Sequence, residues 1–354
     1  MFDVEGQHPF CCACGVTIPD FDDELCDPEA LEQRGPLSEE EQRKASRLFW
    51  SGFLRVIIKH DDRKHSLSGI SRYLYPWQGG PLDLKEWTKE HPFVVPLDRN
   101  EVVTEEDQVI DESWNSKDTR VGIYAANLWD DRNQNLYPHG FPVHAYCWTV
   151  IEQIIGSAAE DKLDIFLQTL RERWKENPFE VDSCVYKQQW FGTIAGSGQL
   201  IPENLIATAD PDNISEIKNI IQSANEELAR RSERNKSIRV RNSFDLPFDV
   251  QRLIIDCLRP RDARNALEAM GWEVSPLYWQ SRTAPIIKYI PEVEHVKLEG
   301  IDREFLFQEA EELFETKELP YGLQNRLRIF RILEGTKKMF FSRLTKPEDN
   351  LRNC

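Results

Sequence analysis

Two short patterns contain the residues best suited to chemistry. Near the start, Cys11-x-x-Cys14-Gly15 places two thiols on a tight turn, and the glycine suits the left-handed backbone that follows such a turn. Much later, His144-x-x-Cys147 places an imidazole and a thiol one helical turn apart on the same face. Mixed thiolate and imidazole ligands suit a closed, tetrahedral zinc site. We therefore expect Cys11, Cys14, His144 and Cys147 to converge on one structural zinc ion.

The same residues have a second interpretation that needs no metal. Buried thiols beside a hydrogen-bonded histidine would also account for them, and Cys147 does lie on an apolar helical stripe. The distances among the cysteine sulfurs and the histidine nitrogen distinguish the two interpretations, because the ligand atoms of one ion must lie about 3–4 Å from one another. Cys12 should point away from the ion. Cys26 or His8 is the expected substitute if one assigned ligand is wrong.

Other patterns give no catalytic site. His60 and His65 flank a charged turn that is typical of a solvated hairpin, and the glycines at 192–198 lack the Lys-Ser/Thr of a phosphate-binding loop. The chain has no G-x-S-x-G, H-E-x-x-H or Walker pattern. We therefore predict no catalytic residues.

The composition of the chain excludes some classes of binding partner. The chain has 354 residues, 40% of them hydrophobic and 30% charged, with a net charge of −17. Such acidity argues against binding to nucleic acid or to an anionic membrane, which needs clustered cations. No apolar run approaches the roughly 20 residues of a membrane span, and the first residues do not resemble a signal peptide. We expect a protein of the cytoplasm or nucleus with reduced cysteines.

The predicted fold class is α+β. Residues 1–208 should form a mixed α+β domain that carries the zinc clasp, with strands at 54–58, 66–74, 93–95 and 121–125, a turn at 139–142 and a helix at 143–156. Residues 209–242 should form a helix and a basic linker. Residues 243–282 should form a compact module of three short helices. Residues 283–354 should form an extended segment, at 285–298, followed by two helices.

The module at 243–282 has clear helix signals. Pro247 suits the first turn of a helix, and Pro260 ends that helix. The apolar residues of this first helix follow helical spacing: Val250, Leu253, Ile254, Cys257 and Leu258. Three such helices cannot bury all their apolar surface alone, so some of it must pack on the rest of the chain or on a partner.

These helices resemble an F-box. The resemblance rests on Leu246-Pro247-Phe248-Asp249-Val250, Leu253-Ile254, Leu258-Arg259-Pro260-Arg261-Asp262 with Asn265, and Ser275-Pro276-Leu277-Tyr278-Trp279. It departs from the family at Asp249, where Glu is commoner, at Ala263, where Leu is commoner, and in its internal position. The whole chain is more loosely similar to fungal F-box proteins, at Cys11 to Gly15, Phe141 to Trp148 and Asn325-Arg326-Leu327-Arg328-Ile329.

The resemblance implies a non-catalytic substrate receptor of an SCF-type cullin ubiquitin ligase. A Skp-type adaptor would be the direct partner, and the target protein is not identified. The implied partner-binding residues are Leu246, Pro247, Val250, Leu253, Ile254, Leu258 and Trp279. The alternative is a zinc-stabilised scaffold whose F-box-like helices serve only internal packing, and a hydrolase or transferase with an unfamiliar site comes third. Burial of the apolar residues of 246–279 distinguishes the receptor from the scaffold, because residues covered by the rest of the chain could not bind an adaptor.

Overall fold

The computed structural model describes residues 10–16, 18, 50–60, 64–72, 93–103, 120–125, 128, 139–177, 206–207, 209–234, 246–272, 274–295 and 301–345. The chain forms two compact units. One comprises Met1–Asp212 and Asn325–Cys354, and the other comprises Asn213–Gln324. The first unit contains the strands of a sheet together with helices, and the described residues of the second unit form helices. The α+β class is therefore confirmed.

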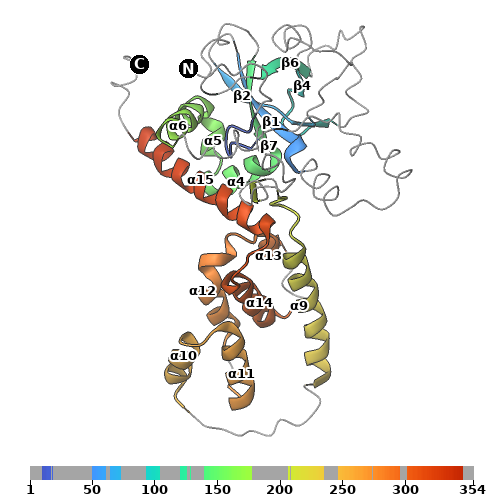
Figure 1. Ribbon diagram of the computed structural model, residues 1–354, viewed down its shortest axis with the longest axis vertical. Coiled ribbons are helices and arrows are strands. Elements are labelled where there is room, and N and C mark those ends of the chain that lie inside the picture. Colours follow the sequence, from blue (N-terminus) through green and yellow to red (C-terminus); the bar gives the residue numbers. More distant parts are fainter. Residues whose placement is uncertain are drawn as a thin grey trace, which may run out of the picture. The chain divides into compact units, whose positions relative to one another are not determined.

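A mixed sheet lies at the centre of the first unit (Figure 1). Its strand order is β4-β6-β7-β1-β3-β5, and β2 pairs with β1. Leu54, Val56 and Ile58 of β1 form a buried core with Ile18 and Val95, which explains why this apolar strand takes a central place. The strands are β1 (Phe53–Lys59), β2 (His65–Leu67), β3 (Ile70–Arg72), β4 (Phe93–Pro96), β5 (Val102–Val103), β6 (Arg120–Ala125) and β7 (His139–His144).

Over its described part, which ends at Arg72, the single strand predicted at 66–74 is two short strands, β2 and β3, separated by Ser68 and Gly69. A Cβ atom at Gly69 would lie 2.4 Å from the carbonyl oxygens of both Asp98 and Glu101. Only glycine allows this close approach of two backbone segments. The approach brings the loop after β4 against the break between β2 and β3.

The turn predicted at 139–142 is wrong, because these residues belong to β7. This strand pairs antiparallel with β1 along its whole length, and its first two residues pair parallel with β6. Pro142 lies beyond the part of β7 that pairs with β6, so its missing N–H loses no bond there. Its carbonyl instead accepts a hydrogen bond of 2.9 Å from the Cys12 N–H.

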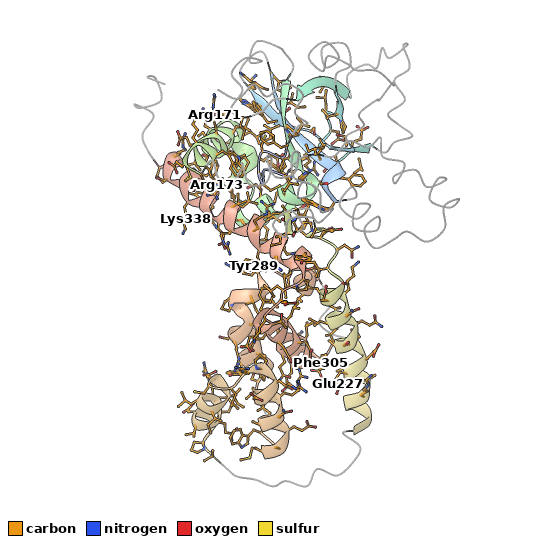
Figure 2. The ribbon with its side chains drawn as sticks, in the orientation of Figure 1. Arg171, Arg173, Glu227, Tyr289, Phe305 and Lys338 are labelled. Carbon is orange, nitrogen blue, oxygen red and sulfur yellow. The ribbon has the colours of Figure 1, made fainter. Side chains whose placement is uncertain are left out.

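The described part of the first unit also contains the helices α4 (Ala145–Ile155), α5 (Ala158–Asp161), α6 (Leu163–Glu176) and, from residue 325 onward, α15 (Tyr321–Leu344). Edge-to-face contacts link Trp148 of α4, Phe166 of α6 and Phe340 of α15, with ring centroids 6.1 and 6.0 Å apart. Arg173 of α6, labelled in Figure 2, lies against Gly335 of α15, where an added Cβ would be 2.6 Å from its Nη1 atom. These contacts fix α15 on α6.

The last helix packs with the N-terminal part of the chain, which differs from the predicted domain boundaries. Asn325 donates hydrogen bonds to the carbonyls of Ala207 and Ala209, at 3.2 and 2.8 Å. The buried Arg326 donates to the Pro211 carbonyl at 2.6 Å. Buried polar side chains that bond to distant backbone carbonyls leave no simple pattern in a sequence, so the predicted division at 283 missed this return.

The second unit is built around α14. Its helices are α9 (Ser215–Arg234), α10 (Phe248–Asp256), α11 (Pro260–Met270), α12 (Pro276–Ile287), α13 (Pro291–His295) and α14 (Arg303–Glu315). Helix α14 contacts α9, α11 and α12, and its Leu306 and Ala310 are buried. The helix α9 includes the first part of the predicted basic linker, up to Arg234, and the rest of that linker lies outside the described residues.

The extended segment predicted at 285–298 is wrong over its described part. Helix α12 continues through Pro285 to Ile287, and α13 follows. A proline inside a helix removes one backbone hydrogen bond and usually ends the helix. Here it lies in the last turn, and packing of α12 on α14 favours the helix over an extended chain.

Arg282 joins three elements of the second unit. From α12 it donates to both carboxylate oxygens of Glu311 on α14, at 2.8 and 2.9 Å, and to the carbonyls of Ile255 and Leu258 at the end of α10, at 2.6 and 2.8 Å. Both charged side chains are largely buried, at 13% and 16% exposure. The pair therefore holds α10 in place.

We predict that Arg282→Ala lowers the free energy of unfolding of the second unit by about 3 kcal/mol, because it leaves the Glu311 carboxylate buried without its cation. Denaturant unfolding of the full chain measures this. The matched control is Arg252→Ala, which removes an exposed helical ion pair with Asp256 at 3.8 Å and should change stability by less than about 0.5 kcal/mol. Equal effects of the two changes would contradict the assigned role.

Candidate functional site

The N-terminal turn is closed by its own backbone. The Gly15 N–H donates to the Cys11 carbonyl at 2.8 Å, and the Cys11 N–H donates to the Val16 carbonyl at 2.9 Å. Gly15 has a φ of 73°, which favours glycine. The turn therefore presents both thiols, of Cys11 and Cys14, on one side, as its sequence predicts.

The second pair of residues lies where β7 becomes α4. His144 is the last residue of β7 and the N-cap of α4, and Cys147 lies in the first turn of that helix. Three positions along a helix bring two side chains to one face. The Cys12–Pro142 backbone bond holds the N-terminal turn beside this junction.

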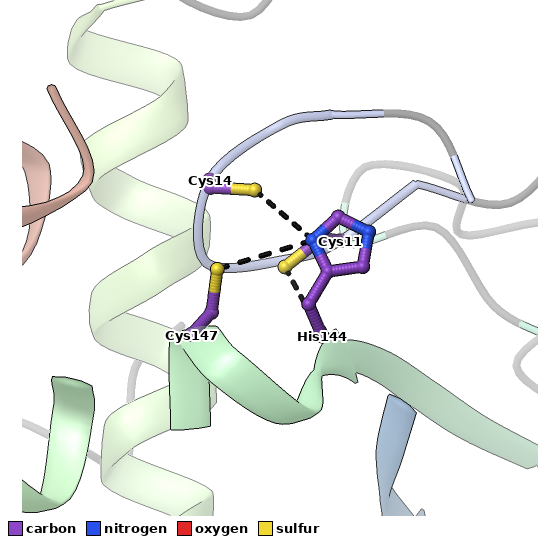
Figure 3. Close-up of side chains that lie close together, drawn as sticks. All are labelled: Cys11, Cys14, His144 and Cys147. Carbon is purple, nitrogen blue, oxygen red and sulfur yellow. Dashed lines mark hydrogen bonds between the residues drawn. The ribbon is translucent and has the colours of Figure 1, made fainter. Parts of the chain in front are cut away.

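The structure brings the four predicted residues together (Figure 3). The ligand atoms of Cys11, Cys14, His144 and Cys147 all lie within 4.8 Å of one another, and all four residues are fully buried. His144 Nδ1 lies 3.4 Å from the Cys14 sulfur and 3.9 Å from the Cys147 sulfur. The His144 backbone N–H lies 3.3 Å from the Cys11 sulfur. Cys12 is outside this cluster, as predicted.

The pKa values of the buried thiols are shifted in different directions by burial and by neighbouring groups. Burial, together with the charges of Cys11 and Cys14, raises the pKa of Cys12 well above its usual value. Burial also raises the pKa of Cys147, and its hydrogen bonds with Cys11 and Cys14 add to this. Burial alone would raise the pKa of Cys11 too. However, hydrogen bonds from the Cys14 and Cys147 thiols and from the backbone of His144 and Cys14 lower it well below the usual range. The hydrogen bonds at Cys11 therefore shift its pKa in the opposite direction to those of Cys12 and Cys147.

The surrounding residues hold the turn from outside. Trp174 Nε1 donates to the Cys12 carbonyl at 2.7 Å, and Arg328 Nη1 donates to the Cys14 carbonyl at 2.9 Å. The His144 ring packs edge-on against Trp50, with centroids 4.8 Å apart. Sequence reasoning did not find these supports. The first two come from helices remote in sequence and bind backbone atoms, which carry no residue signature.

This donor set fits a metal ion. Three sulfurs and one imidazole nitrogen converge at separations close to those of ligands about 2.0–2.3 Å from a common centre. The group could hold a metal ion with protein ligands at all four positions, which is the arrangement of structural rather than catalytic sites. Cys26 and His8, the substitutes considered from sequence, lie outside the described residues.

The F-box-like helices carry an exposed apolar surface. We define the α10–α12 surface as Phe248, Val250, Leu253 and Leu277 with the adjoining residues of α10. Leu277 is 72% exposed, Leu253 64%, Phe248 51% and Val250 38%. Pro247 is also exposed, while Leu246, Ile254 and Leu258 are half-buried.

Helix α10 presents its apolar stripe outward. The buried residue of α10 is Ile255, which lies off the predicted stripe. Of that stripe, Val250, Leu253 and Cys257 are exposed, whereas Ile254 and Leu258 are half-buried. Arg282 binds the Ile255 carbonyl and so fixes the helix in this rotation. Part of a stripe with helical apolar spacing, including Val250 and Leu253, is thus left exposed in the described part of the chain.

Trp279 is not part of this surface, although the resemblance assigned it to partner binding. Its side chain is fully buried, with the Tyr278 ring at 5.2 Å and the Arg282 guanidinium at 5.7 Å from its ring. A large ring at this position fills the interior of the module. Two exposed residues of the quoted motif, Phe248 and Leu277, were not assigned to the surface from sequence.

Within the described residues, His60 and His65 join no group of side chains able to hold a metal ion, and their neighbours Asp61 and Asp62 lie outside those residues. His60 Nε2 lies 2.7 Å from the Ser66 hydroxyl, beside the turn that the sequence predicts. Among the residues that the structure describes, the cluster around Cys11 is the group of histidine, cysteine and acidic side chains able to hold an ion. The glycines at 192–198 lie outside those residues.

We predict that a strong chelator lowers the melting temperature of the purified protein by about 10 °C or more, because loss of even about 3 kcal/mol has that effect in a unit of this size. Cys14→Ser should remove this sensitivity. Cys257→Ser, at an exposed cysteine of the other unit, should retain it. An unchanged melting temperature, with no metal found by elemental analysis, would show that the cluster is a set of buried thiols.

Comparison with protein-family models, curated proteins and solved structures finds no match to this chain. No helix among the described residues is long and apolar enough to cross a membrane. Any proposal of function therefore draws on the sequence motifs and on the geometry of the Cys11 cluster and the α10–α12 surface.

Proposed function

We propose that this protein is a substrate receptor of an SCF-type cullin ubiquitin ligase, and that the α10–α12 surface binds a Skp-type adaptor. The observation that carries the proposal is the exposure of four large apolar side chains on these two helices. The resemblance of residues 246–279 to an F-box supplies the identity of the partner. Such a receptor would act in the cytoplasm or the nucleus.

The surface has the composition of a protein interface. It combines exposed apolar side chains with exposed charged residues of the same helix, Asp249, Arg252 and Asp256. Stable interfaces contain both kinds of residue, with the apolar ones at the centre and the polar ones at the rim. A helix that packs only against its own chain would turn its apolar stripe inward. The outward rotation of α10 therefore favours adaptor binding over the alternative of a scaffold with purely internal helices.

The proposed mechanism is proximity. One surface fixes the receptor to the ligase and another holds the target, so the target lysines meet charged ubiquitin at a raised local concentration. This role needs no catalytic residues in the receptor. The target protein and the surface that binds it are not assigned.

We infer that the ion of the Cys11 cluster is zinc. Three thiolates and one imidazole with no open position favour zinc over the harder divalent ions. Its role would be structural, because it links a turn near the N-terminus to the β7–α4 junction. The second candidate function, a zinc-stabilised scaffold without a ligase role, is supported by this cluster alone.

We predict that Leu253→Asp with Leu277→Asp weakens adaptor binding at least about 30-fold, since truncating interface anchors commonly costs over about 2 kcal/mol and charge adds to this. Leu246→Ala with Pro247→Ala should also weaken it strongly. Affinity for a purified Skp-type adaptor measures both. The matched control is Leu228→Asp, on an exposed leucine of α9 in the same unit.

A footprint of the exposed Cys257 gives an independent measurement, because this thiol lies on the same helical stripe as Leu253. Adaptor binding should slow its alkylation. Undiminished binding by the double aspartate variant, together with unprotected Cys257, would refute the proposed interface and leave the scaffold alternative.

We also predict that the purified protein turns over no ATP, ester, peptide or nicotinamide substrate, since a receptor brings proteins together without bond chemistry of its own. Sensitive turnover assays on the full chain test this. Robust turnover that one point substitution abolishes would replace the proposal with an enzyme.

A further inference from the structure

The segment Asn325 to Arg328 lies beside the metal cluster, although the sequence separates them widely. Arg328 Nη1 donates a hydrogen bond of 2.9 Å to the carbonyl of Cys14, a residue 314 positions away. The guanidinium also donates from Nε to the Asn325 side-chain oxygen at 3.1 Å, and its Nη2 atom is buried. Adaptor binding does not use these contacts.

The Arg328 contact helps to close the turn that carries two ligands. The C=O and N–H of a trans peptide point in opposite directions. Holding the Cys14 carbonyl toward α15 therefore directs the Gly15 N–H inward, where it bonds to the Cys11 carbonyl at 2.8 Å. One side chain thus constrains both ends of the Cys11-x-x-Cys14 turn.

Asn325 orients the guanidinium. Its amide nitrogen donates to the carbonyls of Ala207 and Ala209, so its oxygen is left to face Arg328. Asn325 is fully buried, which fixes this orientation. The arginine therefore reaches the turn from a rigid support.

Charge gives a second reason for an arginine here. Three thiolates carry three negative charges, a divalent ion carries two positive charges, and a neutral imidazole adds none. A loaded cluster is left with one net negative charge in a fully buried site, which is costly unless a cation is near. Arg328 brings a permanent positive charge into hydrogen-bond contact with a residue that bears a ligand.

We propose that Arg328 is a positioning residue of the metal centre: it fixes the Cys11-x-x-Cys14 turn and offsets the negative charge of the loaded cluster, and so raises the affinity for zinc. This inference rests on the metal centre and is independent of adaptor binding. It assigns a role to the Asn325–Arg328 stretch that the proposed receptor function leaves unexplained.

The test is the zinc affinity of the full chain, measured by competition with a chromophoric chelator. Arg328→Met should weaken zinc binding by about 10- to 100-fold, the usual effect of removing a residue that supports a ligand. Arg328→Lys keeps the charge but loses the planar fork, and should lie between Arg328→Met and wild type. Arg331→Met, at an exposed arginine of the same helix, should bind zinc as wild type does.

A merely structural role gives a different result. It would lower the melting temperatures of metal-free and zinc-loaded protein equally and leave the affinity of the folded state unchanged. The proposal expects a smaller zinc-induced rise in melting temperature for Arg328→Met, and an altered thiolate-to-cobalt absorption band when Co²⁺ replaces zinc. If Arg328→Met does not fold, Arg328→Lys provides the same comparison with Arg331→Met.

Wild-type zinc affinity in the folded Arg328 variants would overturn the proposal. Failure of the wild-type chain to bind zinc would overturn the metal centre with it. Neither result would affect adaptor binding, which is measured on the α10–α12 surface. The two proposals therefore fail separately.

Discussion

Burial of three thiols and one imidazole at a single point is the constraint on which the first unit depends. Without an ion, four polar groups at this separation gain only weak sulfur hydrogen bonds, and burial raises the pKa of the Cys147 thiol well above its usual value. With an ion, the same burial becomes favourable, because metal binding contributes free energy to folding. The elements that meet here, the N-terminal turn, β7, α4, α6 and α15, come from distant parts of the chain. The cluster therefore gives them a common anchor.

In the second unit, the orientation of α10 buries one apolar residue and exposes another. Arg282 holds α10 in a rotation that buries Ile255 and leaves Leu253 in solvent. Exposing a leucine of this kind forgoes about 1.5–3 kcal/mol of burial free energy. A chain that stood alone would gain by turning the stripe inward. The ion pair between Arg282 and Glu311 thus holds α10 in an orientation that exposes Leu253. The burial free energy of that leucine would be gained only if another surface covered it.

The sequence predicted the features that depend on residues close together in the chain. The apolar run of β1, the helical spacing of α4 and the knuckle-like turn were all readable, and the four metal-cluster residues followed from their spacing. The strand β7 was missed because Gly140 and Pro142 are turn residues, and only pairing with β1 overrides that preference. Helix α12 was cut short at Pro285 for the same reason, since tertiary packing on α14 is not visible in sequence. The supports from Trp174 and Arg328 bind backbone carbonyls and leave no pattern.

The two sites lie in different units of one chain. All four cluster residues and Arg328 belong to the first unit, whereas the α10–α12 surface belongs entirely to the second. One helix, α15, begins in the second unit and continues in the first, where Asn325 and Arg326 bond to backbone carbonyls before Arg328 reaches the cluster. A receptor needs one surface for the ligase and another for its target. The proposed adaptor-binding surface and the proposed zinc centre therefore share no residue, so a substitution in one leaves the residues of the other in place.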